Sequence, residues 1–172
     1  MLNLSPGWNG LHPLIVYFPI ILLLVAPFLV IVGIGYSAAK RRLFLGSALT
    51  LMVLGTAMTF VAVATGEVAM RGVGPTPAFK VALEEHQALA ETTRELFSVL
   101  TLGFAALLCV PRLLGCELES RLNTALFAAY LLFYATGALF LVNTALEGGR
   151  LIRELEAKTA ATHQLSGKEG AR

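Results

Sequence analysis

The sequence predicts an all-α integral membrane protein, a four-helix up-down-up-down bundle with both termini on the outer, periplasmic side. Four long apolar runs predict this fold, at residues 14–36, 43–66, 96–110 and 122–146 of a chain of 172. A bilayer core about 30 Å thick needs roughly 20 helical residues to cross it, and three of the runs reach that length. The composition agrees, because 56% of the residues are hydrophobic and 14% are charged, against about 25% charged in soluble domains.

The first run opens with the features of a helix start. Asn9 or Gly10 lies near the cap, and Pro13 suits the first helical turn, where its missing N–H breaks no hydrogen bond. Residues 1–11 contain no Lys or Arg, so the positive segment of a cleavable signal peptide is absent. We therefore expect the first helix to stay as a membrane anchor.

The second and fourth runs are rich in small residues, among them Gly46 and Gly55 in the second and Ala135 and Gly137 in the fourth. Small faces let membrane helices approach closely and gain dispersion contacts that lipid does not supply. These runs predict a tightly packed bundle, and the short connections between the runs predict antiparallel neighbours.

The third predicted helix differs from the others, because only its second half, the run 96–110, is apolar. Its first half carries His86, Glu91, Arg94 and Glu95. A titratable side chain is costly in lipid and usually faces a partner, water or a cofactor. The third helix is therefore where we look for function.

Glycines and prolines predict the connections and the chain's end. The segment 70–80 contains two glycines and two prolines, so we expect an irregular loop on the outer side. Gly148 and Gly149 predict that the fourth helix loosens or ends there. The transmembrane domain then covers residues 1–158, and residues 159–172 form a polar tail with little order.

Positive charges in the connections predict the orientation in a bacterial cytoplasmic membrane. The first connection carries Lys40, Arg41 and Arg42, whereas the N-terminal tail has no cation. Arg112 and Arg121 flank the third connection, so both connections lie inside. Arg150, Arg153 and Lys158 follow the fourth run and point the other way, but the first helix usually dominates.

The cysteines and the net charge exclude several classes of site. Cys109 and Cys116 are the only cysteines and form no Cys-x-x-Cys motif, which excludes covalent c-type haem and a four-ligand zinc site. We expect two reduced thiols near the cytoplasmic face. The net charge of +2 is too small to predict nucleic-acid binding.

Two histidines are candidate ligands of a b-type haem. At about 1.5 Å per helical residue, His12 lies roughly 37 Å from Ser37 and His86 roughly 36 Å from Val110, so both sit at the outer edge of the bilayer. Two opposed imidazoles hold haem iron in helical bundles, and Arg94 would pair with a haem propionate. The simpler alternative is that each histidine caps a helix or lies in the headgroup zone.

A polar cluster of uncertain role lies on the same side. Glu91 shares a helical face with Arg94 and Glu95, which predicts an internal ion-pair cluster. Its alternatives are a proton path or a quinone-proximal acid. Three further polar residues at the outer ends of the second and fourth helices belong to this side: Glu67, Asn143 and Glu147.

Residues 11–20, LHPLIVYFPI, resemble the opening signature of a bacterial family of predicted membrane proteins, domain of unknown function two-two-three-one. In outline that signature reads His-Pro-x-x-Val-His-Phe-Pro. The family also has a histidine at the start of the third helix, matched by His86, and a Gly-Gly-x-Leu motif, matched by Gly148, Gly149 and Leu151. The resemblance covers nearly the whole chain.

Two departures limit what the resemblance implies. Some members are fused to Rieske iron–sulfur or c-type cytochrome domains, which implies redox neighbours. Tyr17 stands where the family usually has a second histidine, and Leu155 stands where another histidine usually follows the glycine pair. The resemblance therefore implies one haem at most.

The leading expectation is a membrane-embedded b-type haem protein that transfers electrons, as a subunit of a larger redox complex. Its partners would be the lipid bilayer, other membrane redox subunits or periplasmic electron carriers, and whether it is itself an enzyme stays open. A cofactor-free structural or accessory subunit that packs against partner helices is the alternative. A small transporter is a third reading, weakened because the central halves of three runs hold almost no charge.

Overall fold

Four helices make up the described structure. The computed structural model describes residues 8–70, 77–115 and 120–169, with side chains described for residues 14–37, 39–68, 79–111, 113–115, 121–154 and 157. The helices are α1 (Trp8–Ile34), α2 (Ala38–Met70), α3 (Pro77–Leu113) and α4 (Ser120–Glu169). Within those ranges no strand occurs, which confirms the predicted all-helical class.

Each helix contains a stretch that is long and apolar enough to cross a bilayer. These stretches are Leu14–Ile34, Ala39–Val68, Phe79–Pro111 and Arg121–Glu154. The prediction of four membrane-spanning helices is confirmed. The third stretch is much longer than the apolar run 96–110, because its polar first half continues the same helix.

Two predicted boundaries differ from the structure. The prediction that Gly148 and Gly149 loosen or end the fourth helix is wrong, because α4 passes through both and continues to Glu169. Residues 159–169, expected to be a tail with little order, are therefore helical, and their Ala, Gln, Lys and Glu favour helix. The loop expected at 70–80 is shorter, since α3 begins at Pro77, and residues 71–76 lie outside the described part of the chain.

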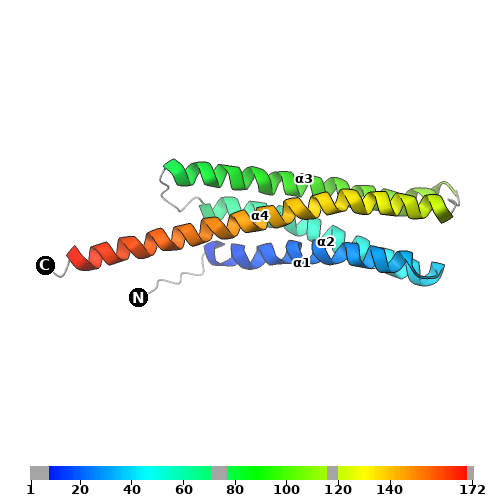
Figure 1. Cartoon of the computed structure of the whole chain (residues 1–172), viewed down its shortest axis with the longest axis horizontal. Coiled ribbons are helices and arrows are strands. Elements are labelled where there is room, and N and C mark those ends of the chain that lie inside the picture. The colour runs from blue at the N-terminus through cyan, green and yellow to red at the C-terminus, as the bar shows by residue number, and fades with distance from the viewer. Residues whose placement is uncertain (1–7, 71–76, 116–119, 170–172) are drawn as a thin grey trace.

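The helices lie side by side along one long axis (Figure 1). α1 contacts α2, α2 contacts α3, α3 contacts α4, and α4 contacts α1. Over the described residues α1 and α3 therefore occupy opposite corners of the bundle. We call the end where α1 and α3 begin the His86 end, and the opposite end, where α2 begins, the Arg41 end.

Every helix contributes buried apolar side chains at spacings of three and four residues, so that they line one face of each helix. The core residues are Leu23, Ala26 and Val30 of α1, Leu45, Ala48 and Met52 of α2, Phe97, Leu100, Phe104 and Leu108 of α3, and Phe127, Tyr130, Tyr134 and Leu141 of α4. Large apolar side chains also cover the outward faces, among them Leu132 and Phe133. In a membrane protein these outward side chains contact lipid.

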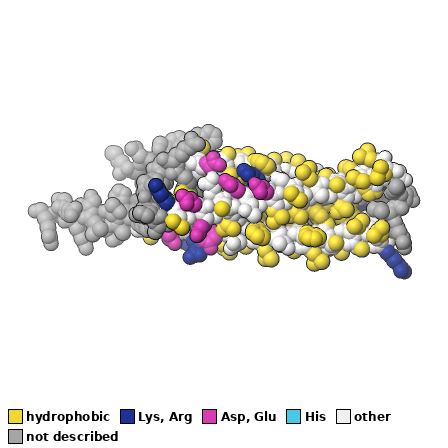
Figure 2. All heavy atoms as spheres, turned by 90° about the horizontal axis from the view of Figure 1, so that it is seen from above, with side chains coloured by type: hydrophobic (Ala, Val, Ile, Leu, Met, Phe, Trp, Pro, Cys, Tyr) yellow, Lys and Arg dark blue, Asp and Glu magenta, His cyan; other side chains and the backbone are white. Residues whose placement is uncertain are grey.

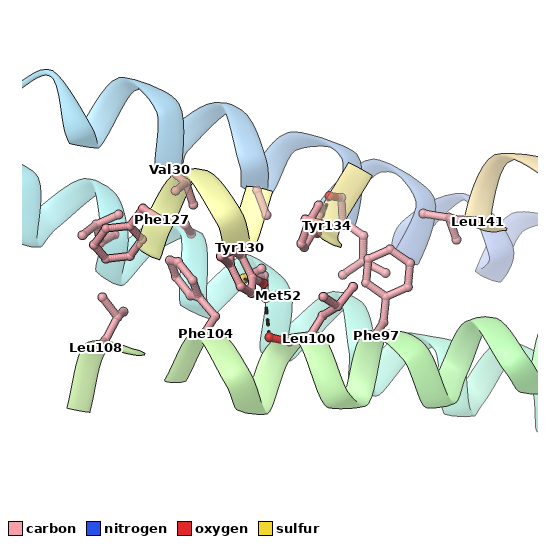
Figure 3. Packing of buried hydrophobic residues seen from close by; sticks show 14 residues of the cluster. Val30, Met52, Phe97, Leu100, Phe104, Leu108, Phe127, Tyr130, Tyr134 and Leu141 are labelled. Carbon is pink, nitrogen blue, oxygen red and sulfur yellow. Dashed lines mark hydrogen bonds between the residues drawn. The ribbon is translucent and has the colours of Figure 1, made fainter. Parts of the chain in front are cut away.

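Aromatic rings fill the middle of the bundle (Figure 3). Phe97 meets Tyr134 edge to face with ring centroids 5.5 Å apart, and Phe104 lies 5.0 Å from Tyr130. The Tyr130 hydroxyl donates to the Leu100 carbonyl over 3.1 Å, which ties α4 to α3. The Tyr134 hydroxyl donates to the Leu23 carbonyl over 2.7 Å, which ties α4 to α1.

Glycines allow the closest helix contacts, as the sequence predicts. A Cβ built on Gly55 would lie 2.7 Å from Leu23 Cγ, and one on Gly137 would lie 2.7 Å from Leu100 Cδ1. These contacts confirm that small residues bring α2 to α1 and α4 to α3. Gly46 plays no such part, because its side faces no atom within 4 Å.

Candidate functional site between α3 and α4

The imidazole of His86 lies against the backbone of α4 at Gly148. A Cβ built on Gly148 would lie 2.9 Å from His86 Cε1 and 3.2 Å from Nε2. No residue with a side chain fits at position 148 unless the imidazole moves. The glycine that was expected to end α4 therefore makes room for a histidine of α3.

One ring nitrogen of His86 is buried and unpaired. Nδ1 has no hydrogen-bond partner among the described residues, although it is shielded from solvent. Buried polar atoms are nearly always hydrogen-bonded, so an exception needs an explanation. A neutral imidazole nitrogen without a partner is competent to bind a metal or to accept a proton.

A pocket of about 360 Å³ opens beside His86, between α3 and α4. We call it the His86 pocket. Glu85 and Leu89 line it from α3, and α4 contributes Asn143, Glu147, Arg150 and Glu154. Arg150 Nη1 pairs with Glu147 Oε1 at 2.9 Å. Because that pair is neutral overall, Glu85 and Glu154 give the pocket its negative charge.

A hydroxyl pair links α3 and α4 beside the pocket, two turns along α3 from His86. The Oγ1 atoms of Thr93 and Thr144 lie 2.8 Å apart. Thr93 Oγ1 also bonds the carbonyl of Leu89, over 2.8 Å. Since Leu89 also lines the pocket, the hydroxyl pair lies directly beside the pocket.

The predicted site residues fall into two groups. His86, Asn143 and Glu147 are brought together in the His86 pocket. Arg94 lies apart from it, with its guanidinium 5.3 Å from the ring centroid of Phe60 on α2. Glu67 lies on α2 and is exposed.

The predicted ion-pair cluster on α3 is smaller than expected. Arg94 Nη2 lies 3.8 Å from Glu95 Oε1. Glu91 instead accepts a hydrogen bond from Gln87 Nε2 over 3.0 Å. The shared helical face of Glu91 and Arg94 thus yields no ion pair among the described side chains, because Arg94 turns toward α2.

Of the two histidines predicted to bind haem, only His86 has a described side chain. His12 belongs to the first turns of α1, but its side chain lies outside the described part of the structure. Cys109 is a free thiol, and Cys116 also lies outside the described residues. Among the residues described, no group of three or more His, Cys, Asp or Glu side chains is arranged to hold a metal ion by itself.

Sequence reasoning missed Glu85, Arg150 and Glu154 as residues of the site. A signal for the residues of α4 was present, because 143, 147, 150 and 154 recur at spacings of four, three and four and so share one helical face. The expectation that the helix ends at the glycine pair hid this continuity.

Charges are distributed unevenly along the bundle. On the face shown in Figure 2, acidic side chains gather toward one end together with a few basic ones, and hydrophobic side chains are spread over the rest of the described surface. At the Arg41 end the guanidinium of Arg41 lies 5.7 Å from the ring centroid of Phe127, and Lys40 Nζ lies 5.4 Å from that of Tyr36. Cations that rest on aromatic rings at a helix end are typical of a membrane interface.

Four helices of membrane-crossing length, apolar on their outward faces, define a multi-pass membrane protein. A family model described as "Predicted membrane protein (DUF2231)" matches residues 9–161, and the chain belongs to this family. This confirms the resemblance drawn from residues 11–20. Comparisons with curated proteins and with solved structures gave no match.

Proposed function

We propose that this protein crosses a bacterial cytoplasmic membrane four times, up-down-up-down, and binds one b-type haem at the His86 end to transfer electrons. The cations near Arg41 favour the cytoplasmic face for that end, which would put both termini on the periplasmic side. The protein would serve as a subunit of a larger redox complex. The observation that carries the proposal is the buried ring nitrogen of His86, which has no partner among the described side chains.

The chain's residues fit a haem in the following way. His86 would supply one nitrogen to the iron, and His12, in the first turns of α1 at the same end of the bundle, would supply the second. The His86 pocket lies between α3 and α4, and α4 also contacts α1, so a group held by both histidines would have to reach from this pocket past α4 to α1. Haem iron would carry one electron by alternating between its ferric and ferrous states.

Arg150 suits a propionate better than Arg94 does. Both guanidiniums can pair with a carboxylate. Arg150 lines the same pocket as His86, whereas Arg94 packs on Phe60 of α2. We therefore assign the propionate contact to Arg150 in place of Arg94.

The test is a visible absorption spectrum of the purified protein, first oxidised and then reduced with dithionite. The wild type and His163→Ala should both show a Soret band and a sharp alpha band, because residue 163 lies far along α4 from the pocket. His86→Ala and His12→Ala should lose these bands. Bands that survive His86→Ala would overturn the ligand assignment, and a colourless wild type would overturn the haem proposal.

A cofactor-free accessory subunit is the second candidate, and the polarity of the pocket favours it. Glu85, Asn143 and Glu154 line the space beside His86, whereas porphyrin faces pack against apolar side chains. In that case His86 serves only the packing of α3 on α4. Co-purification with a larger membrane complex, without any visible pigment, would support this reading.

The aromatic core argues against the transporter reading. Phe97, Phe104 and Tyr134 are fully buried between the helices and fill the centre of the bundle. Ion conduction needs polar ligands along a path. The two phenylalanine rings offer none, and the Tyr134 hydroxyl is already bonded to the Leu23 carbonyl. Ion flux into proteoliposomes that contain only this protein would reverse that conclusion.

A further inference from the structure

Charged residues of α3 reach into the part of the helix that crosses hydrocarbon. Residues 96–111 of α3 contain no charged side chain and span about 24 Å at about 1.5 Å per residue. The hydrocarbon core is about 30 Å thick. With Arg112 at one boundary, the core extends about one turn beyond Leu96 and includes Arg94 and Glu95.

The bundle does not cover the Glu95 carboxylate, whereas the Arg94 guanidinium beside it rests on Phe60 of α2. The Glu95 side chain is 74% exposed and that of Arg94 is 26% exposed. Their mutual contact of 3.8 Å is long for an ion pair, and among the described residues it is the only one that Glu95 makes. A carboxylate that faces lipid in this way is costly, so it marks a surface that another protein covers.

The same face of α3 continues as an apolar strip. Val99 and Leu102 are exposed there, at positions one and two turns from Glu95. Gly103, beside them, has no atom within 4 Å of the place where a Cβ would stand. We call Glu95, Val99, Leu102 and Gly103 the Glu95 face. Its open glycine permits the close approach of another helix.

Two adjacent charges of opposite sign make this face complementary to itself. In a dimer with its two-fold axis along the membrane normal, the same surface of both copies meets, so that if residue i contacts residue j of the other copy, j also contacts i. Arg94 of one copy then meets Glu95 of the other, and the same pair forms a second time across the axis. Lipid chains offer no such partner.

We propose that the Glu95 face is the interface of a homodimer, in which Arg94 and Glu95 form two ion pairs between copies. The apolar strip of Val99 and Leu102 packs against itself below these pairs, around the two open glycines. The dimer uses a different face of α3 from the His86 pocket, and it does not depend on whether haem is bound.

Cysteine crosslinking in native membranes tests the geometry. In a background of Cys109→Ser and Cys116→Ser, Val99→Cys should form a disulfide-linked species of twice 18.4 kDa under mild oxidation. Leu132→Cys is the matched control, because Leu132 is 75% exposed but lies on α4. Equal crosslinking of the two variants, or none at position 99, would overturn the proposal. A crosslink from position 99 to a different protein would also overturn it.

A charge exchange tests the chemistry. Native mass spectrometry of the purified full-length protein should give a dimer. Arg94→Glu and Glu95→Arg should each lower the dimer fraction at least tenfold at equal concentration, because each leaves like charges facing across the axis. The double variant R94E/E95R should restore the dimer. Helicity by circular dichroism identifies any variant that fails to fold, and a folded double variant that stays monomeric contradicts the proposal.

Discussion

The imidazole of His86 occupies the space that a side chain at position 148 would need: a Cβ there would stand 2.9 Å from Cε1. A histidine on α3 and a glycine on α4, far apart in sequence, thus form one unit. The imidazole is held by shape at this contact, since no hydrogen bond fixes Nδ1 among the described residues.

Gly148→Ala should displace the His86 ring and open the pocket to solvent. The added methyl group overpacks a tight contact, for which destabilisation of about 1–3 kcal/mol is typical. Modification of His86 by diethyl pyrocarbonate, measured by mass spectrometry, should become several times faster. Gly149→Ala is the matched control, because its Cβ meets only Arg153 Nη1, at an ordinary 3.5 Å. Equal labelling rates in the two variants would show that Gly148 does not position the ring.

Gly137→Ala should lower the thermal stability of the bundle in detergent. Its methyl group would stand 2.7 Å from Leu100 Cδ1 and press α4 away from α3, at about 1–3 kcal/mol. Gly46→Ala should leave Tm unchanged or raise it, because that position is open and alanine favours helix. Melting curves followed by circular dichroism measure both, and a Tm for Gly137→Ala equal to the wild type would count against the described packing.

Tyr134→Phe should weaken the attachment of α4 to α1. The substitution keeps the ring in the core and removes only the hydrogen bond to the Leu23 carbonyl. The loss should be about 1 kcal/mol, seen as a lower midpoint of unfolding in mixed detergent. Tyr17→Phe, at an exposed position, provides the comparison. If the two variants unfold alike, the hydroxyl of Tyr134 contributes nothing measurable.

Thr93 and Thr144 should be energetically coupled. A double-mutant cycle with Thr93→Val and Thr144→Val isolates the interaction of their hydroxyls, which lie 2.8 Å apart. Interhelical hydrogen bonds in membranes average about 0.6 kcal/mol, and a coupling of that order is expected. Thr92, exposed on the neighbouring position, supplies a third variant whose coupling to Thr144 should be close to zero.

The chain's class could be predicted from the sequence because bilayer crossing is a property of single segments. A helix long and apolar enough to cross lipid is recognisable without knowledge of its neighbours. Three of the four spans followed from that rule, and the third, Phe79–Pro111, is longer than its apolar run because its polar first half belongs to the same helix. The family followed from one short motif near the N-terminus, and its model covers residues 9–161.

The inward face of each helix could not be predicted in the same way. In a water-soluble bundle, polar residues mark the outside, but lipid-facing and core-facing side chains here are equally apolar. Leu23 is fully buried and Ile21, two residues away, is 58% exposed, yet their chemistry is alike. Only packing against the other helices separates them.

The structural role of a glycine depended on which side chains pack against it. From the sequence alone, Gly148 and Gly149 predicted the end of a helix, because glycine is a poor helix former in water. In the structure α4 passes through both, and the close contact of Gly148 with His86 accounts for the absence of a side chain there.

The sequence by itself determined the membrane class, the number of crossings and the end of the molecule that carries His86 and most of the acidic residues, since each depends on local composition. The tertiary structure decided that His86 turns to Gly148 while Arg94 turns to Phe60. It also brought Glu85, Arg150 and Glu154 into one pocket. The physical reason is that a side chain's direction depends on how its helix is rotated against its neighbours. That rotation is set by steric fit between helices, which no single segment encodes.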